Sequence, residues 1–448
     1  MNRRPLHLES LESRDLLTTF VVTSDADTGA GTFRDAVEQA NLDADIDRIA
    51  FHPSVNTVEL ESSVEFTGSQ DLSIGGRGAL LTTTAATAGT FDLFISSGDA
   101  NLKIRDIEFA GGAKGFFAPI SANASGDISF LFNRVSVQDN GLFGLHIDDQ
   151  TNGSDASLKV KIFNSDVQGN GTGALDFDGV RVDEGGLGDI HARVINTIVN
   201  ENGGDGLELD ERGEGGVRML TRGSSYNGNG FFDEADLDDG LDIDEADNGG
   251  LWFRAVDSTF SGNFDEGLDL DEEQGGNVYI NLFKVEANDN VDEGIKVDEK
   301  FDDDGINSDG NLVARLRQVV ANGNRDEEGI ALTEEGAGNF FASFSFVTAN
   351  MNGKEGIDLA EEGAGNLRAI LLRVEANDNA DDGIQIEEAG VGRFGVLANA
   401  IRANGNAKFG MKVAQETVGA DLGRMLLLFN DLTGNTDGDL DATDVTVI

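Results

Sequence analysis

The 448-residue sequence contains no cysteine, so it can form neither a disulfide nor a thiolate metal site, and redox chemistry does not indicate its compartment. It has 3 prolines beside 59 glycines, which favours closely spaced turns over a proline-rich linker. Basic residues are scarce: 32 Lys and Arg stand against 83 Asp and Glu, giving a formal net charge of −51. Nucleic acids and anionic membranes are bound by basic footprints, so this balance argues against both and favours divalent cations or cationic surfaces as partners.

Long apolar runs are also missing from the sequence. No stretch of about 18 apolar residues occurs, so we expect no transmembrane segment. The hydrophobic content of 39% and the 28 Phe nevertheless rule out an acidic disordered chain. We therefore expect one folded, elongated body whose core is lined by Leu, Ile, Val and stacked Phe.

One sequence motif recurs along most of the chain, with Gly267-Leu268-Asp269-Leu270-Asp271-Glu272-Glu273 as its clearest copy. Neighbouring copies start 27 residues apart five times, and the other intervals are 29 to 35 residues, as expected for one unit with short loop insertions. Such self-similarity indicates a solenoid. Aligning the copies on their leading residue, here called the anchor, gives Gly144, Ala174, Gly206, Gly240, Gly267, Gly294, Gly329, Gly356, Gly383, Gly410 and, as a poorer match, Asp439.

Apolar residues alternate with polar residues after each anchor, as in Leu268 and Leu270 or Ile295 and Val297. This period of two is typical of strands, and a second apolar run follows a Gly-rich turn at 278–283. No segment within a unit suits a helix. We therefore predict an all-β fold, a single-stranded parallel β-helix with about 27 residues, three short strands and three turns per coil, and coils about 4.8 Å apart.

Two columns of Asn lie four and six residues before the anchors. Asn tolerates left-handed backbone at tight corners, and stacked amides can hydrogen-bond from coil to coil, so we interpret these columns as turn ladders rather than catalytic groups. They comprise Asn200/Asn202, Asn288/Asn290, Asn350/Asn352, Asn377/Asn379 and Asn404/Asn406.

Residues 1–19 form a predicted leader without the apolar region of an ordinary signal peptide. Within it, Leu11-Glu12-Ser13-Arg14-Asp15-Leu16-Leu17 resembles the LEPR-XLL motif found near the N-termini of large repetitive surface or secreted proteins, mainly of planctomycete bacteria, with Ser13 in place of the usual Pro. This resemblance implies an extracellular or cell-surface location in a bacterium. The alternative is a disordered or briefly helical leader.

Residues 20–54 are predicted to cap the coils. A strand over 20–22 precedes an amphipathic helix over 32–41, in which Thr32 serves as N-cap and Phe33, Ala36, Val37 and Ala40 form one apolar stripe. An amphipathic helix can cover the open core at the end of a solenoid. The segment also resembles the "SLRxAIxxAN…DxIxF" opening of bacterial β-helix surface proteins.

Residues 55–430 are predicted to form the coils, and as a whole they resemble the pectin-lyase-like right-handed parallel β-helix family. The right hand is implied by that resemblance and by the crossover preference of parallel strands. Residues 431–448 contain alternating carboxylates and amides and resemble half a dockerin calcium loop, but Thr433 stands where the first ligand is normally Asp. A degenerate last coil is the alternative.

Three columns predicted to face outward are acidic. One residue before the anchor stand Asp205, Asp239, Glu266, Glu293, Glu328, Glu355 and Asp382. Four residues after it stand Asp148, Asp178, Asp210, Asp244, Asp271, Asp298 and Glu387, interrupted by Thr333 and Ala360. Five residues after it stand Glu211, Glu245, Glu272, Glu299, Glu334, Glu361 and Glu388.

Stacked carboxylates need counter-ions, because two unit charges about 4.8 Å apart repel by about 0.9 kcal/mol in water and about 3.5 kcal/mol at an effective dielectric of 20. Ca²⁺ takes several carboxylate, amide and carbonyl oxygens, so we predict a row of Ca²⁺ sites along these columns and no organic cofactor. The alternative is a solvated acidic face with diffuse ions, which the absence of the Gly-Gly-x-Gly-x-Asp repeat of RTX proteins favours.

The pectin-lyase-like resemblance also implies an enzymatic alternative, a polysaccharide lyase or glycoside hydrolase. Adjacent acids such as Asp148-Asp149 recur as repeat positions and mark no special coil. We expect His146 to be a surface histidine and Trp252 to pack in the core or a turn. The sparse bases are expected to gather into no single site; they include Lys296, Arg315, Arg317, Arg368 and Arg373.

The sequence therefore favours a non-enzymatic structural or adhesive rod with an acidic, calcium-binding stripe. No catalytic residue is predicted. Cell-surface glycans or other surface proteins are its expected macromolecular partners, and enzymatic activity stays open as the alternative.

Overall fold

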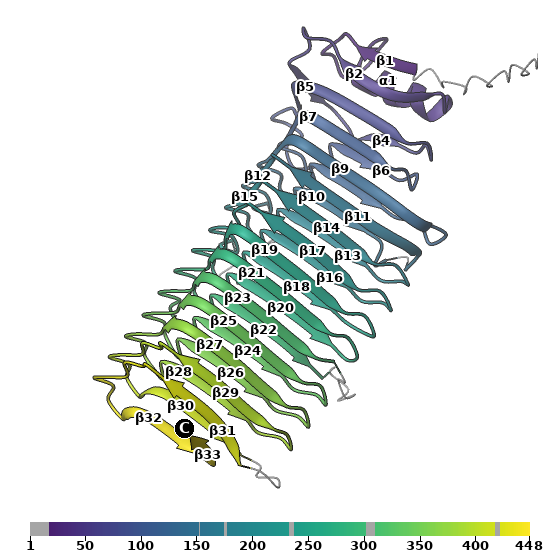
Figure 1. Ribbon diagram of the computed structural model, residues 1–448. Helices are drawn as coiled ribbons and strands as arrows, with labels where there is room; N and C mark the ends of the chain where they lie inside the picture. The colour runs from purple at the N-terminus through teal and green to yellow at the C-terminus, as the bar shows by residue number, and fades with distance from the viewer. Residues whose placement is uncertain (1–17, 152, 174–176, 233–236, 302–309, 417–421) are drawn as a thin grey trace, which may run out of the picture.

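The computed structural model is an elongated parallel β-solenoid whose coils stack along one axis (Figure 1). It describes residues 18–151, 153–173, 177–232, 237–301, 310–416 and 422–448. The LEPR-XLL-like motif lies outside the described residues, and the last two residues of the predicted leader, Thr18 and Thr19, begin the first strand. Across these described ranges, no helix has the length and apolar character needed to cross a membrane.

Two parallel sheets form the walls of the solenoid. The 14-stranded sheet, called sheet B, comprises β4 (Val64–Phe66), β6 (Phe94–Ser96), β8 (Phe116–Pro119), β10 (Leu145–Asp148), β13 (Val180–Glu184), β16 (Leu207–Glu211), β18 (Leu241–Glu245), β20 (Leu268–Glu273), β22 (Ile295–Lys300), β24 (Ile330–Glu334), β26 (Ile357–Glu361), β28 (Ile384–Glu388), β30 (Phe409–Gln415) and β32 (Gly438–Thr443).

The 19-stranded sheet, called sheet A, comprises β1 (Thr18–Val22), β2 (Ile46–Phe51), β3 (Thr57–Leu60), β5 (Leu72–Thr83), β7 (Leu102–Ala110), β9 (Ser125–Gln138), β11 (Asp155–Phe163), β12 (Asp166–Gln168), β14 (Ile190–Ile195), β15 (Ile198–Asn200), β17 (Val217–Arg222), β19 (Leu251–Thr259), β21 (Val278–Glu286), β23 (Leu312–Val320), β25 (Phe340–Thr348), β27 (Leu367–Glu375), β29 (Phe394–Asn399), β31 (Gly423–Leu428) and β33 (Val445–Val447).

The predicted second and third strands of a regular coil are joined in one bent strand of sheet A. In β21 the bend is at Lys284, whose φ of 54° is left-handed, and Gln318 and Arg373 have the same conformation in β23 and β27. The first coils are joined in the same way, as in β7 and β9, whereas the pieces are separate strands in β11 and β12 and in β14 and β15. A single left-handed residue turns the chain while the flanking backbone stays extended and paired with the next coil.

The strand register confirms the repeat and corrects one of its anchors. Leu145 of β10 pairs with Val180 of β13, which pairs with Leu207 of β16. The anchor between Gly144 and Gly206 is therefore Gly179, whereas the predicted anchor Ala174 lies outside the described residues. An insertion before Gly179 hid this register, and Asp178 consequently stands one residue before an anchor, not four after one.

The core between the sheets is apolar and partly aromatic, as predicted. Phe94 and Phe116 lie 5.9 Å apart between ring centroids, and Tyr226 stacks on Phe260 at 5.1 Å. The Asn columns form the predicted ladders: the side-chain amide of Asn352 donates to the carbonyl of Asn379 at 3.1 Å, and Asn379 continues to Asn406 at 3.1 Å. These amides fix the turns from coil to coil.

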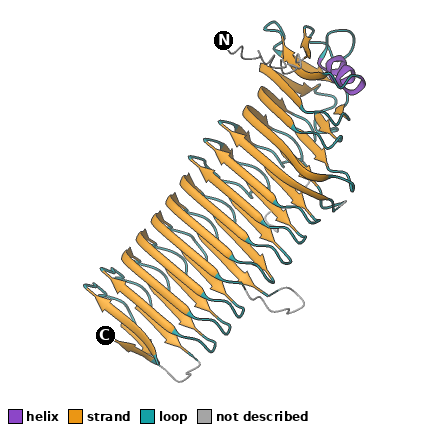
Figure 2. Cartoon of the chain, turned by 45° about the vertical axis from the view of Figure 1, so that its right-hand side comes forward, coloured by secondary structure: helices purple, strands orange, loops and turns teal. Residues whose placement is uncertain are grey.

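The predicted N-terminal helix is α1 (Phe33–Leu42), which lies at the N-terminal end of the solenoid (Figure 2). Thr32 is its N-cap and accepts a hydrogen bond from the backbone N–H of Asp35 at 3.1 Å. Phe33 packs against Phe51 and Phe94, with ring centroids 5.5 and 5.7 Å away. At the other end, β32 pairs with β30, so residues of the calcium-loop-like tail form a coil.

Candidate functional site

The outer surface of sheet B is acidic. Its outward side chains, here called the acidic face, stand one residue before, two after and four after each anchor. The register places successive members of each column side by side, as in Asp244 beside Asp271. The structure therefore brings the predicted columns one before and four after the anchor onto one surface.

The column two residues after the anchor was missed by the sequence analysis. It contributes Glu208, Asp242, Asp269 and Asp358 to the acidic face. The signal was present, because each of these acids is the polar residue between two buried apolar residues of a strand. The column also carries Arg181 and Lys296, so its acidic character is interrupted and less regular.

Carboxylate oxygens converge in several places between β13 and β22. Oxygens from each of several triads lie within 4.8 Å of one another. The triads include Asp178/Asp205/Glu208, Glu208/Asp242/Asp244, Asp239/Asp242/Asp269, Asp239/Asp265/Glu266 and Glu266/Asp292/Glu293. Each combines acids from neighbouring coils, so the parallel register and not one local motif creates these clusters.

The clusters disfavour full ionisation. Burial, followed by the charges of neighbouring acids, raises the pKa of Asp205, Asp239 and Asp242 well above the ordinary range of an aspartate. The same causes, in the same order, raise the pKa of Glu328 to about 8. Such a site takes up either protons or a cation when carboxylates are packed this closely.

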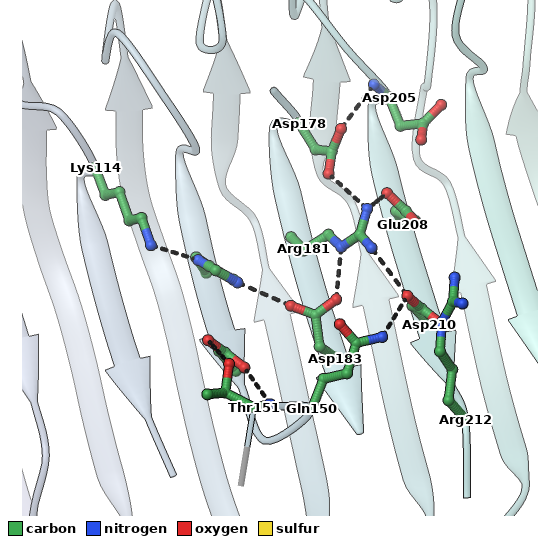
Figure 3. Close-up of polar contacts among 12 residues, drawn as sticks. Lys114, Gln150, Thr151, Asp178, Arg181, Asp183, Asp205, Glu208, Asp210 and Arg212 are labelled. Carbon is green, nitrogen blue, oxygen red and sulfur yellow. Dashed lines mark hydrogen bonds and ion pairs between the residues drawn. The ribbon is translucent and has the colours of Figure 1, made fainter. Parts of the chain in front are cut away.

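Basic side chains pair with acids at both ends of this region. The guanidinium of Arg181 reaches Asp183 at 2.6 Å and Asp210 at 3.0 Å, as Figure 3 shows. The ammonium of Lys296 contacts Asp269 at 2.7 Å and Glu266 at 3.0 Å. The described residues include no ion pair to Asp239 or Asp242, which lie between these two bases.

The predicted outward column five residues after the anchor faces inward. Residues one, three and five after the anchor share a strand face, so Glu272 follows Leu268 and Leu270 into the core and is completely buried. The structure therefore separates this inner column from the acidic face, and the expectation that the column faces outward was wrong. The inner column comprises Glu184, Glu211, Glu245, Glu272, Glu299, Glu334, Glu361 and Glu388, followed by Gln415.

Several inner glutamates accept hydrogen bonds from the turn that follows their strand. Oε1 of Glu334 accepts from the N–H of Gly338 at 3.0 Å, and Oε1 of Glu361 accepts from that of Gly365 at 2.9 Å. Both oxygens of Glu245 lack a donor among the described residues. Burial, followed by the neighbouring acids Glu272 and Glu211, raises the pKa of Glu245 to about 11. Protons shared between neighbouring carboxyl groups would supply the hydrogen-bond donors that the oxygens of this column lack.

A second polar cluster lies at the N-terminal end of the acidic face, around His146. His146 is only 8% exposed, so the expectation of a surface histidine was wrong. Its Nε2 lies 2.8 Å from Asp183 Oδ2, and its Nδ1 lies 2.6 Å from the ammonium of Lys114. These contacts fit a neutral imidazole that donates through Nε2 and accepts at Nδ1.

The electrostatics of the cluster keep that imidazole neutral. Burial lowers the pKa of His146 and the Lys114 charge adds to this, against the hydrogen bond to Asp183 that raises it. Burial alone would raise the pKa of Asp183, but the contacts with His146 and Arg181 together lower it. The cluster opens into a cleft of about 400 Å³ whose lining includes Phe143 and Phe177.

No protein-family model and no curated protein matches the chain. Solved structures do match it in fold. The A-module of mannuronan C-5 epimerase AlgE6 from Azotobacter vinelandii is 11% identical, with a TM-score of 0.36, over 96% of this chain and 99% of that one. Pectate lyase Pel9A is 14% identical, with a TM-score of 0.31, over 95% of this chain and 80% of that one. The surface adhesin PfbA of Streptococcus pneumoniae is 11% identical, with a TM-score of 0.33, over 94% of this chain and 93% of that one.

These likenesses concern the fold alone. The chain is a parallel β-solenoid by its own strand pairing. The similar proteins include enzymes and an adhesin, so they are compatible with both functions considered from the sequence and decide between neither.

Proposed function

We propose that this chain is a non-enzymatic extracellular or cell-surface rod, structural or adhesive, whose acidic face binds Ca²⁺. The triad Asp239, Asp242 and Asp269 carries this proposal. Its oxygens lie within 4.8 Å of one another, and Oδ1 of Asp269 is buried without a hydrogen-bond partner among the described residues. A hard cation that takes six to eight oxygens would replace the missing donors.

The acidic face suits Ca²⁺ because its ligands come from several coils. An ion held by Asp239, Asp242 and Asp269 would join β18 to β20 and relieve the repulsion between their carboxylates. Because these pKa values are raised, Ca²⁺ would compete with protons, and binding would strengthen as pH rises. Calcium would then act as a coil-to-coil cross-link.

Urea unfolding in CaCl₂ and in NaCl of matched ionic strength tests this proposal. For one site with a Kd of about 0.1 mM, 1 mM Ca²⁺ adds roughly 1.4 kcal/mol to the free energy of unfolding, and several sites add more. The double variant Asp239→Asn/Asp242→Asn should lose part of this gain. It should also unfold at higher urea than the parent in EDTA, because the mutual repulsion has gone.

Two control variants locate the effect. Glu38→Gln/Glu61→Gln also removes two carboxylates, but at exposed positions near the N-terminal end and outside the acidic face. This variant should keep the full calcium response. Glu272→Gln/Glu299→Gln changes only the inner column and should also keep it. A calcium response no larger than that of matched NaCl, or equal in all variants, would contradict the proposal and leave the acidic face as a solvated surface.

A second candidate function, processing of a polysaccharide, is favoured by the His146 cluster. The cleft places an imidazole, the Arg181 guanidinium and two aromatic rings together, and such groups can bind a sugar and transfer a proton. Incubation with neutral and acidic glycans should then release reducing ends or unsaturated products. Turnover that His146→Ala abolishes would establish this function in place of the non-enzymatic one.

A further inference from the structure

The outer surface of sheet A has the opposite character to that of sheet B. The second, fourth and sixth residues of seven sheet A strands face outward and are here called the cationic strip. The strands are β14, β17, β19, β21, β23, β25 and β27. All of these positions are described, and none is Asp or Glu, although the chain contains 83 acids. Its bases include Arg193, Arg218, Arg254, Arg315, Arg317 and Arg368.

Three of the bases that were expected to gather into no single site belong to this strip: Arg315 and Arg317 on β23 and Arg368 on β27, with β25 between these two strands. Lys296 lies on sheet B instead. Within the described part of the chain, none of the strip arginines named above takes part in an ion pair. Their positive charge is therefore left uncompensated in a molecule of net charge −51, where a carboxylate would be the commonest neighbour.

Aromatic rings are interleaved with these arginines. The Arg218 guanidinium lies 4.6 Å from the ring centroid of Trp252, which was expected to pack in the core or a turn but faces outward on β19. Arg317 lies 5.3 Å from the Phe283 ring centroid. Tyr279 is 44% exposed and lies on β21, between β19 and β23. Guanidinium groups and aromatic rings thus lie on successive strands along the rod axis.

Acidic residues border the strip on both sides. Asp155 and Asp189 are exposed beside the starts of the sheet A strands, and Asp257 and Glu286 are exposed near their bends. A planar anionic membrane, or the acidic face of a second copy, would meet these carboxylates as well as the arginines. A single polymer chain lying along the rod would meet the arginines alone.

We infer that the cationic strip docks one chain of an anionic polysaccharide, laid along the rod axis. Strands about 4.8 Å apart offer bases and rings at a spacing close to one sugar unit per coil. Carboxylate or sulfate groups would pair with the arginines, and sugar faces would cover the rings. Nucleic acid carries a denser charge and would be repelled more strongly by the acidic borders. This inference rests on the adhesive part of the proposed function and not on calcium.

Trp252 is the single Trp of the chain and provides the readout. Its fluorescence is followed in EDTA while dextran sulfate, or uncharged dextran of equal length, is added. We expect a saturable change with dextran sulfate that weakens as salt increases, and none with dextran. Arg193→Gln/Arg254→Gln/Arg315→Gln leaves the Arg218 contact to Trp252 intact and should weaken binding about tenfold, from three lost charge contacts.

A matched control removes three exposed bases outside the strip, Arg134→Gln/Arg325→Gln/Arg402→Gln, and should leave binding nearly unchanged. Tyr279→Ala tests the stacking contact and keeps the test valid if the triple variant does not fold. Equal weakening by both triple variants would overturn the inference. So would tighter binding of anionic lipid vesicles or oligo(dT), or self-association in sedimentation without any polymer. Because EDTA is present, failure here leaves the calcium proposal untouched.

Discussion

At the scale of single residues, strand parity decides whether an acid meets solvent or the core. Glu299 follows Ile295 and Val297 on the inward face of β22 and is completely buried. Burial first, then the neighbouring acids Glu334 and Glu272, raises its pKa to about 9, while an unfolded glutamate titrates near 4.5. Its neutral form is therefore favoured by folding. The stability that this group contributes is complete below about pH 4.5 and is lost as pH rises through about 9.

We predict that, at pH 9, the free energy of unfolding of Glu299→Gln is higher than that of the parent by on the order of 1 kcal/mol or more, because Gln cannot ionise. At pH 5 the two proteins should differ little, since the glutamate is already protonated there. Urea unfolding at pH 5, 7 and 9 measures the difference. Glu286→Gln, at an exposed position, is the control and should show no such pH dependence. Equal pH dependence of Glu299→Gln and the parent would contradict the protonated inner column.

At the scale of elements, the strands, the Asn ladders and α1 followed from the sequence because local periodicity and capping specify them. What did not follow depends on register across coils. The insertion before Gly179 displaced one anchor, and the inward position of Glu272 was hidden because Glu is rarely buried. The cationic strip was missed because its arginines, such as Arg193 and Arg368, are far apart in sequence and share only the outward face of sheet A strands.

The helix α1 gives a prediction at this scale. Phe33→Asp/Val37→Asp places two charges where completely buried side chains contact the first coils, so we expect it to lower the free energy of unfolding by about 3 kcal/mol or more and to promote aggregation. Light scattering after gel filtration and urea unfolding measure both effects. Glu38→Ala, on the exposed side of α1, should change neither. A double variant that stayed monomeric and unfolded like the parent would show that α1 does not protect the core edge.

At the scale of the whole molecule, the coils contact mainly their neighbours, so stability varies along the rod as the local interactions vary. The strongest acid crowding lies between β16 and β24, on both faces of sheet B. Burial is the first cause of each raised pKa there: about 9 for Glu211 and about 8 for Asp265 and Glu328. These groups favour folding while protonated, so rising pH removes their contribution between about 4 and 9. Coils with few such groups, such as those of β5 to β9, should be affected less.

Hydrogen exchange followed by mass spectrometry should therefore change its pattern with pH. At pH 5, after correction for the intrinsic rate, we expect exchange to be fastest at the two ends, where coils have one neighbour. At pH 9 in EDTA, strands β16 to β24 should lose protection by a larger factor than the coils around β7 or β27, because ionised carboxylates repel on both sides of sheet B. Adding Ca²⁺ at pH 9 should restore part of that protection, since cations bound at the acidic face cannot reach the inner glutamates. Exchange that begins at the ends at both pH values would show that the acid crowding does not control the stability of the central coils.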